Sequence, residues 1–586
     1  MCGVFGICGR LQAPGEASDI PAANAASPAG PWPLPAAHLT YLGLFALQHR
    51  GQESAGIAVS TWENGVAGAR NRGRPAEVAA RYEEAEVTVG GGILLRKDMG
   101  LVAEVFDREK LEQLPGSAAI GHVRYSTTGA SRRENAQPLL GITSHGPVAI
   151  AHNGNFTNAS SLRRRLLSAG AIFQTTTDTE LLLALISQSA AEDLPQAVAQ
   201  ALQAVRGAYA LVILGEQPAG RLASSSTGRP AGRPAGGSAV RSSGRPAGGA
   251  GGGMPGIAGD RPGPGEAAGA ANETWPVLIG CRDPYGLRPL VVGERPDAYV
   301  LASETCALAT VGATLVTELA PGEAAIITPA GLRIERWFPP RRSALCVFEY
   351  IYLARPDSEL EGQSVHRVRQ AIGRELAAEA PVEADVVIPA PDSGTSAALG
   401  YSQGSGIPFD LGLVKNRYVG RTFIQPDQAA RELGVRIKLN PVRSVLAGRR
   451  VVVVDDSIVR GTTSRKTVAL LREAGAKEVH LMIASPPYRY PCYYGVDTTD
   501  EEKLIARRHS VEEIRQVVGA DSLHFVSLAG LLRAVRGVRG GGAGETEFDA
   551  DLCTACFSGR YPTELPEGAR PAKDELEREW QHAGTS

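Results

Sequence analysis

The 586-residue sequence has few of the features that mark membrane, secreted or nucleic-acid-binding proteins. Aromatic residues make up only 5%, and no apolar run approaches the ~18 residues of a membrane span. A formal net charge of −2 gives no electrostatic reason to expect binding to nucleic acid or to an anionic membrane. The first residues, MCGVFGICGR, lack the basic start of a secretory signal, so we expect a cytoplasmic protein.

Cysteine is also scarce, with eight scattered residues that are too few for a disulfide framework. In a reducing compartment, a cluster among them would indicate catalysis or metal binding. The length exceeds what one hydrophobic core supports, so two large domains are expected.

Two stretches of biased composition interrupt the chain, and we expect both to be disordered loops remote from the functional sites. Residues 12–37 are rich in Ala and Pro, and residues 216–274 contain GRPA three times and the run GGAGGG. Such composition cannot offset the entropy lost on ordering. The second stretch separates AYALVILG from WPVLIG, which we expect to be neighbouring strands of one sheet.

The pattern of apolar residues changes along the chain. Before about residue 330 it predicts many short strands and one clear helix, over roughly 178–205. After about residue 345, strand-like runs such as RRVVVVDDS alternate with helical stretches, one of them over about 462–473. This alternation favours a mostly parallel sheet covered on both faces.

The segment VVVVDDSIVRGTTSRK (451–466) predicts an anion site at the end of a buried strand. A short Ser/Gly/Thr loop opens the following helix, whose N-terminus attracts phosphate. The acidic pair Asp455 and Asp456 would repel a phosphate alone, but suits ribose hydroxyls and a Mg²⁺-bound pyrophosphate.

This segment resembles the phosphoribosyl pyrophosphate (PRPP) signature of type I phosphoribosyltransferases, which implies an open parallel sheet with a flexible hood. The resemblance implies Mg²⁺, one per subunit, held by Ser393 of PAPDSGTSAA with Asp455 and Asp456. It also implies a closing loop in LVKNRYVGRTFIQP (413–426) that carries Lys415, Arg417 and Arg421. The implied PRPP-binding residues are Lys415, Arg417, Asp455, Asp456, Ser457, Val459, Arg460, Gly461, Thr462, Thr463 and Ser464.

Cys2 becomes the first residue if Met1 is removed, and then carries a thiol and a free α-amine on one carbon. The reference pKa of an α-amine is about 7.7–8.0, so a useful fraction can accept the thiol proton at neutral pH. A buried structural cysteine is the competing interpretation, and it describes Cys8, on the same face of the same expected strand.

Four further segments resemble the class II glutamine amidotransferases: ALQHRGQESAGIA, GHVRYSTTG, AHNGNFTN and TTTDTE. The resemblance implies an N-terminal-nucleophile αββα sandwich in which Cys2 is catalytic. Asn153 and Gly154 would form the oxyanion hole. Arg124 would bind the α-carboxylate of glutamine and Asp178 its α-ammonium, and Arg50 would position the Cys2 end of the site.

LCTACF (552–557) places Cys553 and Cys556 at a spacing that suits one metal or one cluster edge. Spacing alone does not choose the missing ligands from Cys281, Cys306, Cys346 and Cys492. SETCALATVGA and SPPYRYPCYYGVD resemble segments of iron–sulfur-bearing glutamine amidotransferases. This resemblance implies Cys306 and Cys492 as ligands of one [4Fe–4S] cluster per subunit, and makes Cys281 and Cys346 core residues. Structural zinc is the alternative.

Together the two halves resemble the amidophosphoribosyltransferase family, which opens purine synthesis by transferring glutamine-derived ammonia to PRPP. We expect a glutaminase domain over 2–330, a phosphoribosyltransferase domain over 331–535 and a cysteine-bearing tail over 536–586. The resemblance also implies a homotetramer inhibited by purine nucleotides. The alternatives are another class II amidotransferase, such as a glucosamine-6-phosphate synthase, and a non-catalytic PRPP-sensing regulator.

Overall fold

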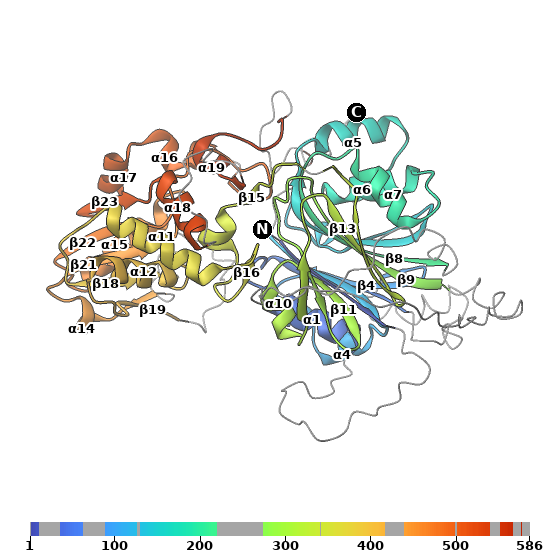
Figure 1. The fold of residues 1–586 in the computed structure, drawn as a ribbon, viewed down its shortest axis with the longest axis horizontal. Coiled ribbons are helices and arrows are strands. Elements are labelled where there is room, and N and C mark those ends of the chain that lie inside the picture. The colour runs from blue at the N-terminus through green and yellow to red at the C-terminus, as the bar shows by residue number, and fades with distance from the viewer. Residues whose placement is uncertain are drawn as a thin grey trace, which may run out of the picture.

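The computed structural model describes residues 2–10, 35–61, 88–125, 129–218, 274–339, 341–416, 439–498, 501–538, 551–565 and 576. Most of both predicted insertions therefore lies outside the described residues. Their edges were misplaced: residues 36–37 begin a helix, and residues 216–218 and 274 belong to strands. A layered sandwich and a smaller domain built on a parallel sheet lie next to each other (Figure 1).

The N-terminal domain packs two antiparallel sheets face to face. Among the described residues the first sheet has eight strands, in the order β12 (Thr314–Glu318), β10 (Val291–Glu294), β11 (Ala298–Ala302), β1 (Gly3–Gly9), β5 (Ala118–Arg124), β2 (Ser54–Ser60), β4 (Ile93–Met99) and β3 (Thr88–Gly90). The second has six, in the order β14 (Gly331–Arg336), β13 (Glu323–Thr328), β9 (Thr274–Arg282), β8 (Gly207–Pro218), β7 (Gly146–Phe156) and β6 (Leu139–Thr143).

Helices cover the outer face of each sheet. The first is covered by α1 (Ala36–Ala46), α3 (Val102–Val105), α4 (Arg108–Glu112) and α10 (Thr305–Thr310), and the second by α5 (Ala159–Ser168), α6 (Thr179–Gln188) and α7 (Leu194–Leu202). A short 3-10 helix, η1 (Arg133–Asn135), precedes β6. The predicted αββα sandwich is confirmed, as is the pairing of AYALVILG with WPVLIG, since β8 pairs with β9.

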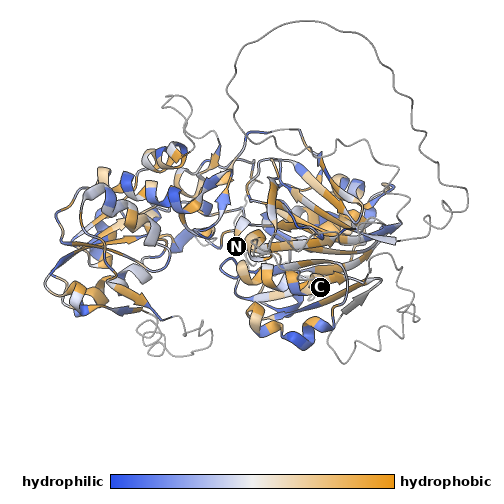
Figure 2. Cartoon of the chain, turned by 60° about the horizontal axis from the view of Figure 1, so that its bottom comes forward, coloured by the Kyte–Doolittle hydropathy of each residue, from blue (hydrophilic) through white to orange (hydrophobic). Residues whose placement is uncertain are grey.

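Alternation along β1 explains why both faces of its sheet are buried. Phe5 and Ile7 point to the helices, whereas Val4 and Cys8 point to the second sheet. The strands of the sandwich are accordingly apolar along most of their length (Figure 2).

The helix predicted over 178–205 is wrong as a single element, because α6 and α7 are separate. Asp193 caps α7 by accepting a hydrogen bond from the backbone N–H of Gln196 at 2.8 Å. Pro195 lies in the first turn of α7, where its missing N–H costs nothing. These two residues start a new helix where apolar periodicity alone suggested a continuous one.

The C-terminal domain is built on a four-stranded parallel sheet in the order β18 (Val386–Pro389), β21 (Arg450–Asp455), β22 (Glu478–Ile483) and β23 (Ser522–Phe525). The valines of β21 alternate: Val452 and Val454 face one core, and Val451 and Val453 face the other. On the first face lie α11 (Val365–Glu379), α12 (Thr395–Ser405) and α18 (Leu528–Val538), and on the second α15 (Thr462–Glu473) and α17 (Val511–Val518).

Short elements complete this domain. They are β15 (Leu345–Cys346), η2 (Glu349–Leu353), β16 (Glu359–Leu360), β17 (Gln363–Ser364), β19 (Leu413–Lys415), β20 (Leu439–Pro441), α14 (Arg443–Leu446), η3 (Glu501–Lys503), α16 (Ile505–Arg508), β24 (Leu552–Cys553) and α19 (Ala555–Ser558). β24 pairs in parallel with β15, so the tail returns to the start of the domain.

Two predicted domain boundaries shift. β14 pairs with β13, so the sandwich extends to Arg336 and past the expected limit at residue 330. The limit at residue 535 falls inside α18, which ends at Val538. No helix among the described residues is both long and apolar enough to cross a membrane.

Candidate active site

Cys2 lies at the start of β1, where strand pairing places it beside the end of β5. Gly3 is paired with Val123, and the Cys2 thiol is 3.6 Å from the carbonyl oxygen of Tyr125. Burial raises the pKa of the Cys2 thiol, while the positive charges of the chain's N-terminus and of Arg124 oppose that rise. Burial alone raises the pKa of Cys8 to about 12, so these two cysteines of one strand differ in their charged surroundings.

The side chain of Asn153 faces the same space between the sheets. Ala149 and Ala151 of β7 pack into the core between the sheets, and alternation places Asn153 on that side too. Asn153 is fully buried, and among the described residues neither its amide nitrogen nor its amide oxygen has a hydrogen-bond partner. An unpaired buried amide is costly, which points to a polar partner supplied by a ligand.

Gly154 follows with a φ of +155°, and a Cβ at this position would lie only 2.0 Å from the carbonyl oxygen of Ala208. Glycine is therefore required, because any side chain would push β7 away from β8.

The two residues predicted to bind glutamine flank these strands. Arg124 is buried at the end of β5 and donates hydrogen bonds to the carbonyl oxygens of Ala130 (3.0 Å) and Gly129 (3.2 Å). Asp178 precedes α6 and accepts a hydrogen bond from the backbone N–H of Phe156 at 2.8 Å. Burial would raise the pKa of Asp178, but His152 and this N–H hold it below the usual value, so the carboxylate is ionised. The site thus offers a fixed cation and a fixed anion.

Arg50 was predicted to position the Cys2 end of the glutamine site. Its guanidinium is fully buried and pairs with Glu304 and with Glu349, the latter at 2.6 Å. Its Cβ does lie close to Gly3, the residue after Cys2, since a Cβ built on Gly3 would be 3.5 Å from the Arg50 Cβ. The resemblance identified the right neighbourhood, but the carboxylate partners come from distant segments that no local motif reveals.

The second site lies at the carboxyl ends of β18 and β21, as predicted. The backbone N–H of Ala390 donates to the carbonyl oxygen of Val454 at 2.9 Å, which brings the loop with Ser393 beside Asp455. Burial, then the adjacent Asp456 carboxylate, raises the pKa of Asp455 well above its usual value. A hydroxyl-rich or cationic ligand would relieve this crowding of negative charge.

The loop after β21 opens α15 in the predicted way. Gly461 has a φ of +75° and forms the N-cap, where no side chain accepts a hydrogen bond from the first turn. Thr462 and Thr463 are exposed there, while Ser464 is buried. The backbone N–H groups of this turn can therefore donate hydrogen bonds to a phosphate. Ser457, Val459 and Arg460 fill the loop between Asp456 and Gly461.

Lys415 is the last residue of β19. It forms an ion pair at 2.8 Å with Asp392, the residue that precedes Ser393 in the sequence. Arg417 and Arg421 lie outside the described residues.

The cysteines group differently from the prediction. Cys346, Cys492, Cys553 and Cys556 line one cavity with Leu287, Phe348, Tyr488, Tyr494, Val496, Ala555 and Tyr561. Cys346 is paired with Cys553 through β15 and β24, so it belongs to the group. Among the described residues, no three His, Cys, Asp or Glu side chains converge closely enough to hold a single ion.

Cys306 was predicted as a ligand, and that prediction is wrong. It is buried in α10 under the first sheet of the sandwich, with its thiol 3.7 Å from a Glu304 carboxylate oxygen. Cys281 is a core residue, as expected. Cys346 is also buried in a core, as expected, but it lines the cavity with the other three cysteines as well. The pairing of β15 with the distant β24 decides this, and such pairing leaves no trace in local spacing.

The comparisons with known proteins agree with both domains. Residues 122–224 match the glutamine amidotransferase domain, and residues 360–511 match the phosphoribosyl transferase domain. The chain is 42% identical to an amidophosphoribosyltransferase of Bacillus subtilis, over 96% of this chain and 94% of that protein. It is 43% identical to that of Synechococcus elongatus, over 98% and 94% of the two chains.

A solved structure of glutamine PRPP amidotransferase from B. subtilis, complexed with ADP and GMP, superimposes with a TM-score of 0.73. It shares 41% sequence identity, and the match covers 97% of this chain and 99% of that chain.

A glutaminase sandwich joined to a phosphoribosyltransferase domain defines a glutamine-dependent transferase that uses PRPP as a substrate. The chain belongs to the amidophosphoribosyltransferase family. The phosphoribosyltransferase domain stands where a glucosamine-6-phosphate synthase would carry sugar-isomerase domains, so that alternative is excluded.

Proposed function

We propose that the enzyme converts PRPP, glutamine and water to 5-phosphoribosylamine, glutamate and pyrophosphate, with Cys2 as the glutaminase nucleophile. The observation that supports this assignment most strongly is the buried, unpaired amide of Asn153 on the same side of the sandwich as Cys2. Such an amide suits an oxyanion that exists only during the reaction.

In the glutaminase site, Arg124 pairs with the α-carboxylate of glutamine and Asp178 with its α-ammonium. After removal of Met1, the α-amine of Cys2 accepts the thiol proton, and the thiolate attacks the side-chain amide carbon. Asn153 and the N–H of Gly154 donate to the oxyanion. The α-amine returns its proton to the leaving ammonia, and water then hydrolyses the thioester to glutamate.

In the phosphoribosyltransferase site, the loop 457–464 holds the 5-phosphate, and Asp455 and Asp456 hold the ribose hydroxyls. Ser393, Asp455 and Asp456 would hold one Mg²⁺, which neutralises the charge of the departing pyrophosphate. Lys415 lies beside Ser393 and adds positive charge. Arg417 is proposed to contact PRPP on sequence grounds alone. Ammonia passes internally from Cys2 to C1 of PRPP.

We propose that Cys346, Cys492, Cys553 and Cys556 hold one [4Fe–4S] cluster. Burial raises the pKa of Cys346 to about 11 and that of Cys553 still further, so these thiols stay protonated unless a metal replaces the proton. The apolar and aromatic lining of the cavity suits a cluster with one thiolate on each iron. A zinc ion would need four sulfurs at about 2.3 Å from one point.

The nucleotides in the B. subtilis structure make purine nucleotides the proposed feedback inhibitors. A homotetramer remains a prediction from the family resemblance.

An electrophilic glutamine analogue and intact-mass measurement test the nucleophile. We expect a chain without Met1 that gains one adduct, mapped by peptide sequencing to Cys2 and absent from Cys2→Ala. A retained Met1 in active enzyme would contradict the mechanism, because it blocks the amine. Labelling of Cys8 instead would contradict the assignment.

A further inference from the structure

A segment of the C-terminal domain supports the strand that carries the proposed oxyanion hole. The side-chain nitrogen of Asn155 in β7 donates to the carbonyl oxygen of Tyr493 at 3.0 Å. A Cβ built on Gly495 would lie 3.0 Å from the carbonyl oxygen of Gly154. The end of β7 is therefore held from behind by residues 493–495.

Arg288 in turn holds this segment in place. It is completely buried in the loop after β9 and donates to the carbonyl oxygen of Tyr494 from Nε (3.1 Å) and Nη2 (2.6 Å). Its Nη1 donates to Glu349 at 3.4 Å. If Arg288 served only to neutralise charge, the Glu349 carboxylate would be a sufficient partner. Two of its three guanidinium nitrogens instead donate to the Tyr494 carbonyl. This geometry fixes a position as well as compensating a charge.

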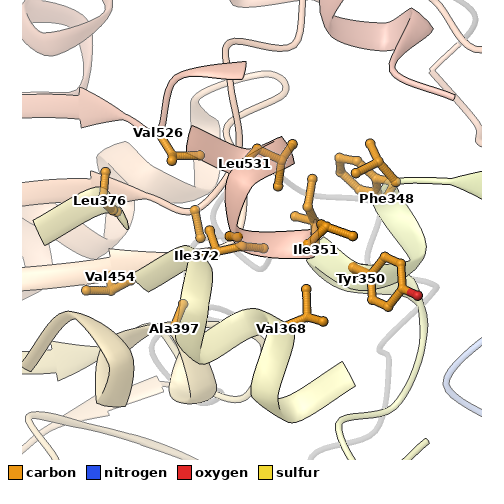
Figure 3. Close-up of a cluster of buried hydrophobic side chains, with 14 of the residues drawn as sticks. Phe348, Tyr350, Ile351, Val368, Ile372, Leu376, Ala397, Val454, Val526 and Leu531 are labelled. Atoms are coloured by element: carbon orange, nitrogen blue, oxygen red, sulfur yellow. The ribbon is translucent and has the colours of Figure 1, made fainter. Parts of the chain in front are cut away.

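Glu349 is itself fixed by the core of the C-terminal domain. Its neighbours Phe348, Tyr350 and Ile351 are buried in the cluster that also contains Val368 and Ile372 (Figure 3). The other oxygen of Glu349 accepts from Arg50 at 2.6 Å.

Arg50 completes the connection, because its Cβ lies behind Gly3, the residue after Cys2. The buried set Arg288, Glu349 and Arg50 thus links the Tyr494 carbonyl, in the segment that supports β7, to the surroundings of Gly3 in β1.

We propose that Arg288 is a positioning residue for the glutaminase reaction, acting through the Tyr494 carbonyl on the backbone of Gly154. The proposal rests on the assignment of Gly154 as an oxyanion donor. An oxyanion donor acts in the transition state and not on bound glutamine. A shifted donor therefore lowers kcat for glutamine and leaves KM for glutamine nearly unchanged.

The test compares Arg288→Lys and Arg288→Met with Arg369→Lys in the full-length holoenzyme. Arg369 is a matched control, because it is also buried and donates to two backbone carbonyls, those of Tyr350 (2.6 Å) and Ala354 (2.7 Å). These carbonyls belong to the C-terminal domain and lie outside the segment that supports β7. Ammonia-dependent synthesis from PRPP, kcat and KM for glutamine, and the melting temperature are measured for each variant.

We expect both Arg288 variants to lose about tenfold to a hundredfold in kcat for glutamine, with KM and ammonia-dependent synthesis within about twofold of the parent enzyme. Arg369→Lys should leave the ratio of glutamine-dependent to ammonia-dependent rates unchanged. Equal losses of both activities in the Arg288 variants, or no loss in kcat, would overturn the proposal.

If the Arg288→Met chain does not fold, Asn155→Ala removes the contact to Tyr493 from the other side and should give the same selective loss. Glutamate formation by Cys2→Ala would refute the proposed nucleophile, whereas an inactive Cys2→Ala with a normal Arg288→Lys would refute the positioning role only.

Discussion

At the scale of one residue, Asn153 is a buried polar group without a partner among the described residues, and the proposed mechanism gives it one in an oxyanion that forms only during the reaction. Leaving an amide unpaired in a core costs about 1–3 kcal/mol. The backbone of Asn153 is fixed by its pairing with Ala210 of β8, so its side chain stays on the buried side of the strand. The resemblance predicted this residue, but only the structure shows that its side chain has no other partner among the described residues.

Asn153→Ala should therefore lower kcat for glutamine by about 10²- to 10³-fold while raising the melting temperature or leaving it unchanged. Asn158→Ala is the control, since Asn158 donates to the Ala204 carbonyl at 2.9 Å and serves packing. The control should lose stability and keep kcat, and the reverse pattern would contradict the oxyanion role.

Lys97 of β4 is a residue that no motif singled out. Its amine donates to the carbonyl oxygens of Glu134 (3.1 Å) and Ala136 (2.5 Å). Burial, followed by the nearby Arg124, lowers the pKa of Lys97 to about 8.

Above about pH 8 the folded protein releases this proton, while the unfolded chain keeps it up to the ordinary lysine pKa of 10.5. The unfolding free energy of the parent protein should therefore rise relative to Lys97→Met as pH increases from 8 to 10. Chemical denaturation at several pH values measures this, and a difference that falls or stays constant would refute it.

Asp455 presents the opposite arrangement, a carboxylate crowded by burial and by Asp456. In Asp455→Asn we expect a melting temperature no lower than that of the parent protein without ligand, because the repulsion between the two adjacent carboxylates is relieved. The rise in melting temperature on adding Mg²⁺ and PRPP should be lost. A thermal-shift titration measures both, with the exposed Asp521→Asn as control; a full ligand shift in Asp455→Asn would contradict its role.

At the scale of elements, the sequence predicted where strands and their following loops lie along the chain. It did not predict which strands distant in sequence contact one another. The runs of valine around 451–454 and the Gly461–Thr462 transition predicted β21, the loop and α15 with correct bounds. The break between α6 and α7 was missed because Asp193 and Pro195 act locally within an apolar pattern that otherwise continues.

The cysteine site shows the limit of spacing as a guide. Cys553 and Cys556 were recognised by proximity in sequence, but Cys346 joins them through parallel pairing of two-residue strands separated by most of the C-terminal domain.

The cysteine assignment predicts different metal contents for two single variants. The anaerobically purified parent protein should be brown, with about four irons per chain. Cys346→Ser should lose iron and colour, whereas Cys306→Ser should keep both, since Cys306 is buried in another domain. Metal analysis and visible absorption decide this; a colourless zinc protein, or iron loss in Cys306→Ser alone, would refute the assignment.

At the scale of the whole molecule, both domain architectures followed from the sequence, whereas the interface between the domains did not. The parallel sheet leaves a local pattern of strand–helix alternation, whereas the αββα sandwich was predicted from the resemblance of four short segments to class II glutamine amidotransferases. The buried ion pairs of Arg50, Arg288, Glu304 and Glu349 join segments up to 299 positions apart, and a single sequence carries no signal for such pairs.

The interface joins two active sites in one enzyme. In the proposed mechanism, glutamine hydrolysis in the N-terminal domain can be lost while synthesis from PRPP and ammonia in the C-terminal domain continues. The most direct test of this central claim is the rate of 5-phosphoribosylamine formation by Cys2→Ala with glutamine and, separately, with ammonia, with Cys8→Ala as control. We expect Cys2→Ala to lose glutamine-dependent synthesis and retain ammonia-dependent synthesis, and Cys8→Ala to retain both. Loss of both activities in Cys2→Ala, or persistence of glutamine-dependent synthesis, would contradict the account.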